Sequence, residues 1–503
     1  MSIKSTVKAV LYRMNIIKGA KNALRNAGIS ELEDFYSRIT RWEKIYSGDA
    51  DWLNVNKTAI GDHGKRKMAN FNAANTLCRE FSALAFAEQC KINVADKPCN
   101  DYIKTVLQEN GFWDNFPIFY ERILSSGGGA LSAYLEDGKI KIDYVRANRF
   151  LPYSWDNRRI LNAGFVSQTQ KNDMVYTLIR SEKLTADGME VDHKLFEGKG
   201  YDDIGTEVPL EKLYPNVKEH CIFSGAAFPL FAYLKPNAAN VYEPDCPLGV
   251  SIYSAAEDTL KALDVAFDSF SREFILGKRR IIVPAKCLRT VIDPETKQPT
   301  RYFDATDETY VAFNDPDAEN LKIKDNTVAL RIEEHVAGIN ALLNILCFQT
   351  GLSSGSLSFD GAGLKTATEV ISQNSKTYRT KRTHQNMITE ALEQLVHAII
   401  YLGACVGAIS CPCYDVTIKF DDGIVVDTNT KIDNHIKLVS AQLESKLRAV
   451  MDILGLSEEE AKNELQKIQQ ESTVTGTPDD WYSEDGGSKD DAGTNTGAVT
   501  ATS

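Results

Sequence analysis

Residues 350–366 interrupt two strongly helical patterns with a segment rich in glycine and serine. The segment, TGLSSGSLSFDGAGLKT, holds four glycines and four serines. Apolar residues recur at steps of three and four on both sides of it: Ile332, Val336, Ile339, Leu343 and Leu346 before, and Ile388, Leu392, Leu395, Ile399 and Leu402 after. That spacing places apolar side chains on one face of a helix. The sequence therefore predicts two long helices joined by a pliant loop, with Thr366 and Glu369 capping the second helix.

Three interpretations of this loop are open. It can be an ordinary surface connection between helices, or a functional loop built to move against a partner, because long loops are usually functional or disordered. The stretch Gly363-Leu364-Lys365-Thr366 also resembles a phosphate-binding loop. That motif needs glycine directly before the lysine and a strand before the loop. Here Leu364 and a predicted helix occupy those places, so nucleotide binding is disfavoured.

The charge of the chain limits how it can meet nucleic acid. Over 503 residues the formal net charge is −12. A protein that grips nucleic acid through a broad basic face is usually basic overall, so this class is disfavoured. An acidic balance still permits a protein past which DNA slides.

The ten cysteines are scattered, and only Cys411 and Cys413 lie close together. One intervening residue is not the usual zinc spacing, so we expect reduced thiols, no metal, no cofactor and assembly in a cytoplasm. The longest apolar run, residues 398–409, has about twelve residues, which is too short to span a bilayer. The N-terminus also lacks the profile of a signal peptide. No membrane association is expected.

The first half of the chain changes from helical to β patterns. Helices are predicted within residues 1–47, over 64–89 and over 101–125. From 130 to 235 apolar and polar residues alternate, with Asp-Gly turns at Asp137 and Asp187. Alternation between such turns is typical of antiparallel hairpins.

A helix predicted over 250–276 starts near a capping box of Ser254 and Glu257. Its apolar stripe, close to a coiled-coil seam, comprises Ala256, Leu260, Leu263, Phe267, Phe270 and Phe274. Such a stripe can pack on a second helix of the same chain or on a neighbouring subunit. A β-rich insert over 277–326 follows, and a second helix over 327–348 then leads into the glycine-rich loop.

The C-terminal part is again helical. The longest helix is predicted from Thr366 to about Ala404, with a basic run at Lys376, Arg379, Lys381 and Arg382. A strand pair is expected over 414–420 and 423–426, followed by helices near 430–453 and 458–470. Residues 471–503 are acidic and rich in Gly, Ser and Thr, which is typical of a disordered tail.

This order of parts resembles the portal proteins of tailed bacteriophages. Residues 248–280 resemble the first stem helix and the entry to the clip, and residues 327–348 resemble the second stem helix. Residues 350–365 resemble the tunnel loop, and residues 367–382 the start of the long helix behind it. Residues 41–48 and 65–68 are similar to portals of siphophages that infect Gram-positive hosts. The resemblance covers roughly residues 35–470.

The resemblance implies an α+β portal fold with the following parts: an N-terminal helical segment (1–47), a first wing part (48–244), stem helix 1 (245–276), the clip (277–326), stem helix 2 (327–349), the tunnel loop (350–366), the long helix and second wing part (367–426), a helical crown (427–470) and the acidic tail (471–503). It also implies a structural protein of the virion rather than an enzyme.

The implied function is a ring of twelve copies at one capsid vertex, through which double-stranded DNA is packaged, retained and ejected. The implied partners are the terminase large subunit, a head-completion adaptor, and the major capsid and scaffolding proteins. The residues expected to act are Ser353, Ser354, Gly355, Ser356, Leu357, Phe359 and Lys365 in the channel loop, Lys376, Arg379 and Lys381 on the channel side, Lys278, Arg279 and Arg280 in the clip, and Leu260, Leu263, Phe267, Phe270 and Phe274 between subunits. The alternatives are another virion structural protein, such as a capsid or baseplate component, and a nucleotide-dependent enzyme.

Overall fold

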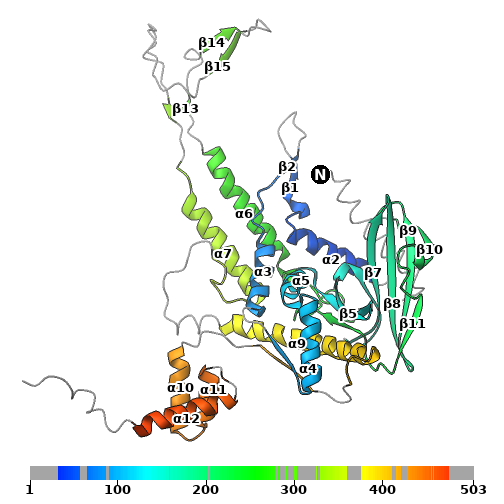
Figure 1. Cartoon of the computed structure of the whole chain (residues 1–503). Helices are drawn as coiled ribbons and strands as arrows, with labels where there is room; N and C mark the ends of the chain where they lie inside the picture. Colours follow the sequence, from blue (N-terminus) through cyan, green and yellow to red (C-terminus); the bar gives the residue numbers. More distant parts are fainter. Residues whose placement is uncertain are drawn as a thin grey trace, which may run out of the picture. The chain divides into compact units, whose positions relative to one another are not determined.

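The fold is known from a computed structural model of the chain (Figure 1). It describes residues 32–56, 65–86, 90–157, 159–201, 203–277, 281–282, 289–292, 299–302, 324–325, 329–358, 375–410, 415–420, 428–454, 456 and 458–474. The chain divides into two compact units, residues 1–422 and 423–503.

Helices and strands are mixed, as the α+β expectation requires. The helices of the first unit are α2 (Glu33–Tyr46), α3 (Ala73–Phe86), α4 (Lys97–Glu109), α5 (Phe112–Ser126), α6 (Glu257–Leu276), α7 (Ile332–Thr350) and α9 (Ser375–Cys405). The second unit holds α10 (Thr428–Ser440), α11 (Lys446–Leu454) and α12 (Glu458–Val474).

All strand pairs in the described residues are antiparallel. The strands are β1 (Asn54–Asn56), β2 (Lys65–Lys67), β3 (Lys91–Val94), β4 (Gly129–Glu136), β5 (Lys139–Arg146), β6 (Phe150–Asp156), β7 (Arg159–Lys171), β8 (Met174–Thr185), β9 (Gly188–Gly198), β10 (Thr206–Val208), β11 (His220–Ser224), β12 (Phe231–Leu234), β13 (Ile281–Ile282), β14 (Arg289–Ile292), β15 (Pro299–Tyr302), β16 (Lys324–Asp325) and β17 (Val416–Lys419).

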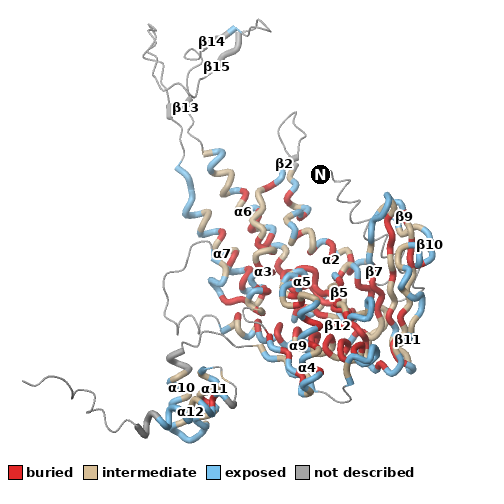
Figure 2. The backbone as a smooth tube through the Cα atoms, viewed as in Figure 1, coloured by how far each residue is buried: buried red, intermediate tan, exposed pale blue. Residues whose placement is uncertain are grey.

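Two sheets form the predicted β region. The larger has the order β10-β9-β8-β7-β6, with β11 also paired to β9, and the smaller has the order β12-β4-β5. The predicted turn at Asp137 and Gly138 joins β4 to β5, and both residues have positive φ, as a tight hairpin turn requires. The buried residues gather where α5 and α9 meet the smaller sheet and where α3 packs on α5 (Figure 2).

The helix predicted over 64–89 is wrong in its first part. Residues 65–67 form strand β2, which pairs with β1, and α3 begins only at Ala73. Distant partners account for the difference, because Arg66 and the backbone N–H groups of Ala69 and Phe71 all bind carboxylates of α6. These tertiary bonds override the local helical pattern.

The single helix predicted over 101–125 is two helices, α4 and α5. Gly111 has a φ of +55° and lies between them, a conformation that glycine adopts without strain. The Asn110 side chain holds the break in place, because its amide donates to the carbonyl of Ile140 and its oxygen accepts from the N–H of Ile142 on β5.

Other expected boundaries also differ. Helix α6 begins at Glu257 without a side-chain cap, because Glu257 binds Arg41 and Trp42 instead of closing a capping box with Ser254. Strand β17 pairs with β3, whose residues lie more than 300 positions earlier, and residues 423–426 lie outside the described residues. Among the described C-terminal residues there are three helices, and α12 continues to Val474, past the expected start of the tail.

The cysteines follow the expectation in part. Cys78, Cys90, Cys221, Cys246, Cys347 and Cys405 are free. Cys99, buried on α4, is disulfide-bonded, which contradicts the expectation that all thiols are reduced. Cys411, Cys413 and the expected cap at Thr366 and Glu369 lie outside the described residues.

Candidate channel loop and subunit contacts

Helices α6 and α7 lie side by side and run antiparallel (Figure 1). At one end Thr259 donates to the side chain of Gln349 (2.8 Å), and at the other Arg331 binds Glu273 (3.0 Å). The insert therefore leaves the pair at one end and the glycine-rich loop at the other. With 19 residues at about 1.5 Å each, α7 separates the insert from the glycine-rich loop by roughly 28 Å.

The first half of the loop, which the sequence predicts to be pliant, forms a hydrogen-bonded turn. Gly351 ends α7 with a φ of +83°, and the N–H of Leu352 returns to the carbonyl of Cys347 (2.8 Å). The Asn344 side-chain oxygen accepts from the hydroxyl of Ser354 and from the N–H of Gly355, both at 2.9 Å. Residues 351–355 are thus tied back onto α7.

The same turn is tied forward to α9. The N–H of Ser353 donates to the Thr377 hydroxyl (2.8 Å), and the N–H of Thr377 donates to the Ser353 hydroxyl (3.3 Å). The Thr380 hydroxyl donates to the carbonyl of Gly351 (2.7 Å). Ser353 is only 3% exposed and Thr377 8% exposed, so this reciprocal pair is shielded from water.

The predicted loop residues have different environments. Ser354, Gly355 and Ser356 are exposed. Leu357 is half-buried and packs against the main core. Phe359 and Lys365 lie outside the described residues.

Only one of the three predicted channel-side cations is on open surface. The Lys376 ammonium donates to the carbonyl of Phe348 (2.9 Å) and lies 4.5 Å from the centre of its ring. Lys381 is buried, so the structure contradicts its assignment to a channel surface of this chain. Arg379 is exposed.

The predicted subunit-packing stripe on α6 is partly used inside the chain. Leu260 and Leu263 are buried in the chain's own core and are not available to a neighbour. Phe267 is half-buried and meets the Phe71 ring edge-on at 5.4 Å. The first half of the stripe therefore packs intramolecularly.

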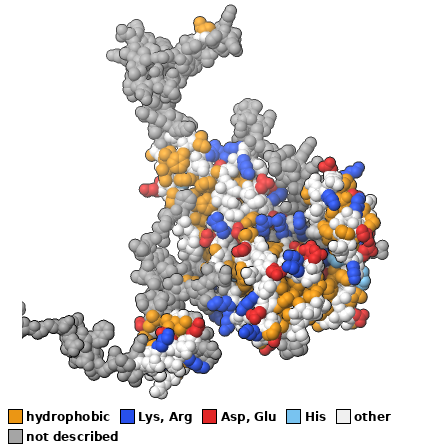
Figure 3. All heavy atoms as spheres, in the orientation of Figure 1, with side chains coloured by type: hydrophobic (Ala, Val, Ile, Leu, Met, Phe, Trp, Pro, Cys, Tyr) orange, Lys and Arg blue, Asp and Glu red, His pale blue; other side chains and the backbone are white. Residues whose placement is uncertain are grey.

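The second half of the stripe approaches the surface. Phe270 lies between Phe274 (5.1 Å) and His335 of α7 (6.0 Å). Phe274 is 43% exposed. It belongs to a group of exposed apolar residues at the insert end of the two helices, Phe274, Ile275, Leu276, Leu330 and Ile332. Hydrophobic side chains gather at this end of α6 in Figure 3.

At the root of the insert, β13 pairs with β16, and Ile281 lies opposite Asp325. Strands β14 and β15 form a second pair within it. The β character predicted for residues 277–326 is thus present. The predicted clip cations Lys278, Arg279 and Arg280 lie outside the described residues.

The sequence reading missed a row of carboxylates on α6. Asp268 accepts both guanidinium nitrogens of Arg66 (2.6 and 2.9 Å), and this pairing lowers its pKa. Asp264 accepts the Trp52 indole N–H (2.9 Å), and burial raises its pKa. The spacing 257, 264 and 268 puts three acids on one helix face, which was the available signal.

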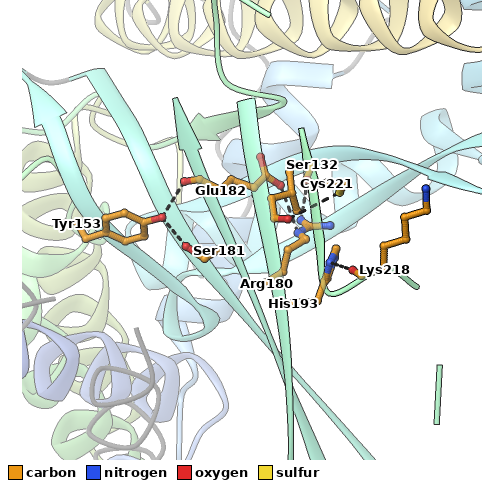
Figure 4. Close-up of polar contacts among 9 residues, drawn as sticks. Ser132, Tyr153, Arg180, Ser181, Glu182, His193, Lys218 and Cys221 are labelled. Carbon is orange, nitrogen blue, oxygen red and sulfur yellow. Dashed lines mark hydrogen bonds and ion pairs between the residues drawn. The ribbon is translucent and has the colours of Figure 1, made fainter. Parts of the chain in front are cut away.

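A second missed cluster joins β6, β8 and β9 of the larger sheet to β4 of the smaller sheet (Figure 4). Arg180 donates to the Ser132 hydroxyl (2.7 Å) and lies 3.2 Å from Glu182. Burial raises the pKa of Glu182. The Tyr153 hydroxyl donates to the Glu182 carbonyl (2.9 Å). His193 on β9 contacts the Lys218 carbonyl through Nδ1 (3.0 Å).

Neither cluster forms a metal site. Across the part of the chain that the structure describes, no three His, Cys, Asp or Glu side chains are placed to hold a metal ion. None of the described helices has a stretch long and apolar enough to cross a membrane.

The comparison with known families is consistent with this arrangement. The chain matches the family described as phage portal protein, SPP1 Gp6-like, over residues 28–475. No curated protein matches it. Portal proteins are structural components of the virion that form an oligomeric ring at the head–tail connection and serve DNA packaging. The match extends from before α2 to the end of α12, and the chain therefore belongs to the SPP1 Gp6-like family of phage portal proteins.

Proposed function

We propose that this portal chain forms a ring of twelve copies through the outer faces of α6 and α7. The main support for this proposal is the apolar surface of these helices that is exposed to solvent. On α7, Ala337, Ala341, Ile345 and Phe348 are all exposed and follow helical spacing, and Phe348 is 76% exposed. A helix that is apolar on nearly all sides is normally buried. Continuous exposed apolar surface marks an interaction site, and a neighbouring copy supplies the cover.

The ring encloses a channel for double-stranded DNA, with the glycine-rich loop as its narrow part. Leu357 and Phe359 pack against neighbouring loops, and Lys365 makes transient phosphate contacts. DNA carries one negative charge per about 1.7 Å, so a strongly basic channel would retain it. The net charge of −12 per chain leaves weak, screened contacts that permit sliding.

The insert 277–326 is the contact surface for the terminase large subunit and later for the head-completion adaptor. Support comes from its place at the end of the α6–α7 pair opposite the loop. The remaining partners are the major capsid and scaffolding proteins, met during assembly in the host cytoplasm. Crosslinks from Lys278 or Lys297 should reach the motor or the adaptor, and crosslinks only to the capsid shell would contradict this placement.

Ring formation is tested by mass. Phe348→Asp and Ile345→Asp each place an unpaired charge in the proposed subunit contact, which is costly to bury. Light scattering should find both variants as monomers or small oligomers. Ile222→Asp is the matched control, because Ile222 lies on β11 of the larger sheet and is as exposed as Ile345 (48% and 47%). Rings of normal mass from the α7 variants would refute the proposed contact.

The channel role is tested separately by deleting residues 359–365. This deletion spares every described residue of the turn. It should leave the ring mass unchanged and lower the amount of DNA packaged or retained in particles. Normal packaging and retention would remove the loop from the mechanism.

A further inference from the structure

The turn at residues 351–356 makes more bonds than a helix end requires. Gly351 in its left-handed conformation and the bond from Leu352 to Cys347 already complete the end of α7. The Ser353–Thr377 pair and the bonds to Asn344 and Thr380 are additional. The Ser353–Thr377 pair joins residues 24 positions apart in the chain.

These additional bonds are polar, whereas the buried side chains in the C-terminal part of α9 are apolar. From Ile388 onward the buried residues of α9 are alanine, valine, leucine, isoleucine and one glycine. Aliphatic packing tolerates small displacements, but a hydrogen bond restricts both distance and direction. The reciprocal pair of Ser353 and Thr377 therefore fixes where the two ends of the loop meet.

A native cysteine lies beneath this junction. Cys347 is completely buried on α7. Burial raises the pKa of its thiol, and hydrogen bonding from the backbone of Leu357 opposes this shift. The backbone of Ser356, within the turn, also bonds the thiol, so opening of the turn would uncover it for a reagent.

We infer that Ser353, Thr377 and Asn344 are positioning residues, which staple both ends of the loop so that the segment after Ser358 starts from one fixed point. The inference rests on the proposed function in taking this loop as the part that meets DNA. The bonds of Ser353, Thr377 and Asn344 hold both ends of the loop together. A displacement within the loop is therefore not transmitted to α7 or α9.

The test is the rate at which iodoacetamide alkylates Cys347 in the assembled ring, measured on its peptide by mass spectrometry. Thr377→Val keeps the shape and removes the hydroxyl, leaving the N–H of Ser353 unpaired. Losing a buried hydrogen bond shifts the opening equilibrium by about tenfold, and alkylation should accelerate by that factor. Thr377→Ser restores the hydroxyl and should return the rate to near that of the wild type.

Cys78 is the internal reference, because it is equally buried on α3, away from the turn. The alkylation rate of Cys78 should stay unchanged in Thr377→Val. Equal acceleration at Cys78 and Cys347 would show that the whole fold had loosened, and it would overturn the staple. An unchanged Cys347 rate would also overturn it. Asn344→Ala is a second variant on an exposed side chain, and it should accelerate Cys347 in the same direction.

A DNA assay separates this inference from the proposed function. Thr377→Val rings of normal mass should package or retain less DNA, and Thr377→Ser rings should match the wild type. If deleting residues 359–365 leaves packaging normal, the channel role fails, while the alkylation rates still decide the staple. If that deletion impairs packaging and Thr377→Val does not, the positioning role is refuted.

Discussion

His384 should make the free energy of unfolding depend on pH. It lies on α9 and is 5% exposed. Its ring accepts or donates a hydrogen bond with the Tyr120 hydroxyl of α5 (3.1 Å) and lies 5.5 Å from the Phe81 ring of α3. Burial lowers the pKa of His384 from 6.5 to about 4. If the His384 ring were protonated in the folded chain, its charge would be buried among these aromatic neighbours.

The sign follows from proton binding. Between pH 6.5 and pH 4 the unfolded chain carries the proton on residue 384 and the folded chain does not. Stability is therefore lost as the pH falls through this window, and the loss is complete below the folded pKa. The lowered pKa corresponds to roughly 3 kcal/mol in total, of which about 2 kcal/mol falls between pH 7 and pH 5.

Urea unfolding at pH 7 and pH 5 measures this loss. His384→Gln cannot protonate, so it should lose about 2 kcal/mol less than the wild type between the two pH values. The other titrating groups are shared and cancel in the comparison. Gln385→Met is the control, because Gln385 is buried next to His384 on α9 and carries no ionisable group, so the pH dependence should stay that of the wild type. An equal loss in His384→Gln and wild type would refute the argument.

Three further perturbations test the missed ion pairs. Asp268→Asn weakens the charged bonds that hold the segment before α3 and should cost about 2 kcal/mol in urea unfolding. Glu273→Gln should speed amide exchange in the first turn of α7, because it releases Arg331. In the wild type the Glu273–Arg331 ion pair should persist at pH 4, since the pKa of Glu273 is about 2. Arg180→Met leaves Glu182 buried without its cation and should cost about 3 kcal/mol, read from thermal unfolding.

Local patterns predicted the parts of the fold whose causes are local. The helical stripes of α6, α7 and α9 and the hairpin turn at Asp137 depend on residues within a few positions of one another. The order of helix, β insert, helix and loop also followed from these patterns, and it was enough to indicate the portal family. The resemblance from residues 35–470 is confirmed by the family match. The Gram-positive host stays a prediction.

The errors occur where distant residues decide the local structure. Residues 65–67 form a strand because Arg66 binds Asp268, 202 positions away. His384 is buried against Tyr120, 264 positions away. No window of sequence contains both partners of such a pair. The stapled turn was missed for the same reason, since serine and threonine are typical of exposed loops and of hydrogen-bonded junctions alike.

The positions of the cations around the loop bear on how DNA could pass. The sequence places four of them at the start of α9, which can be a solvated helix face or can lie on the channel side. In the structure Lys376 is bound to the carbonyl of Phe348 and Lys381 is buried, so Arg379 and Arg382 are the members of the run that stay exposed. Each phosphate contact that is missing makes binding weaker and less dependent on salt. The turn at residues 351–356 is held by uncharged hydrogen bonds, so in the proposed channel role its position would not depend on cations that capture DNA.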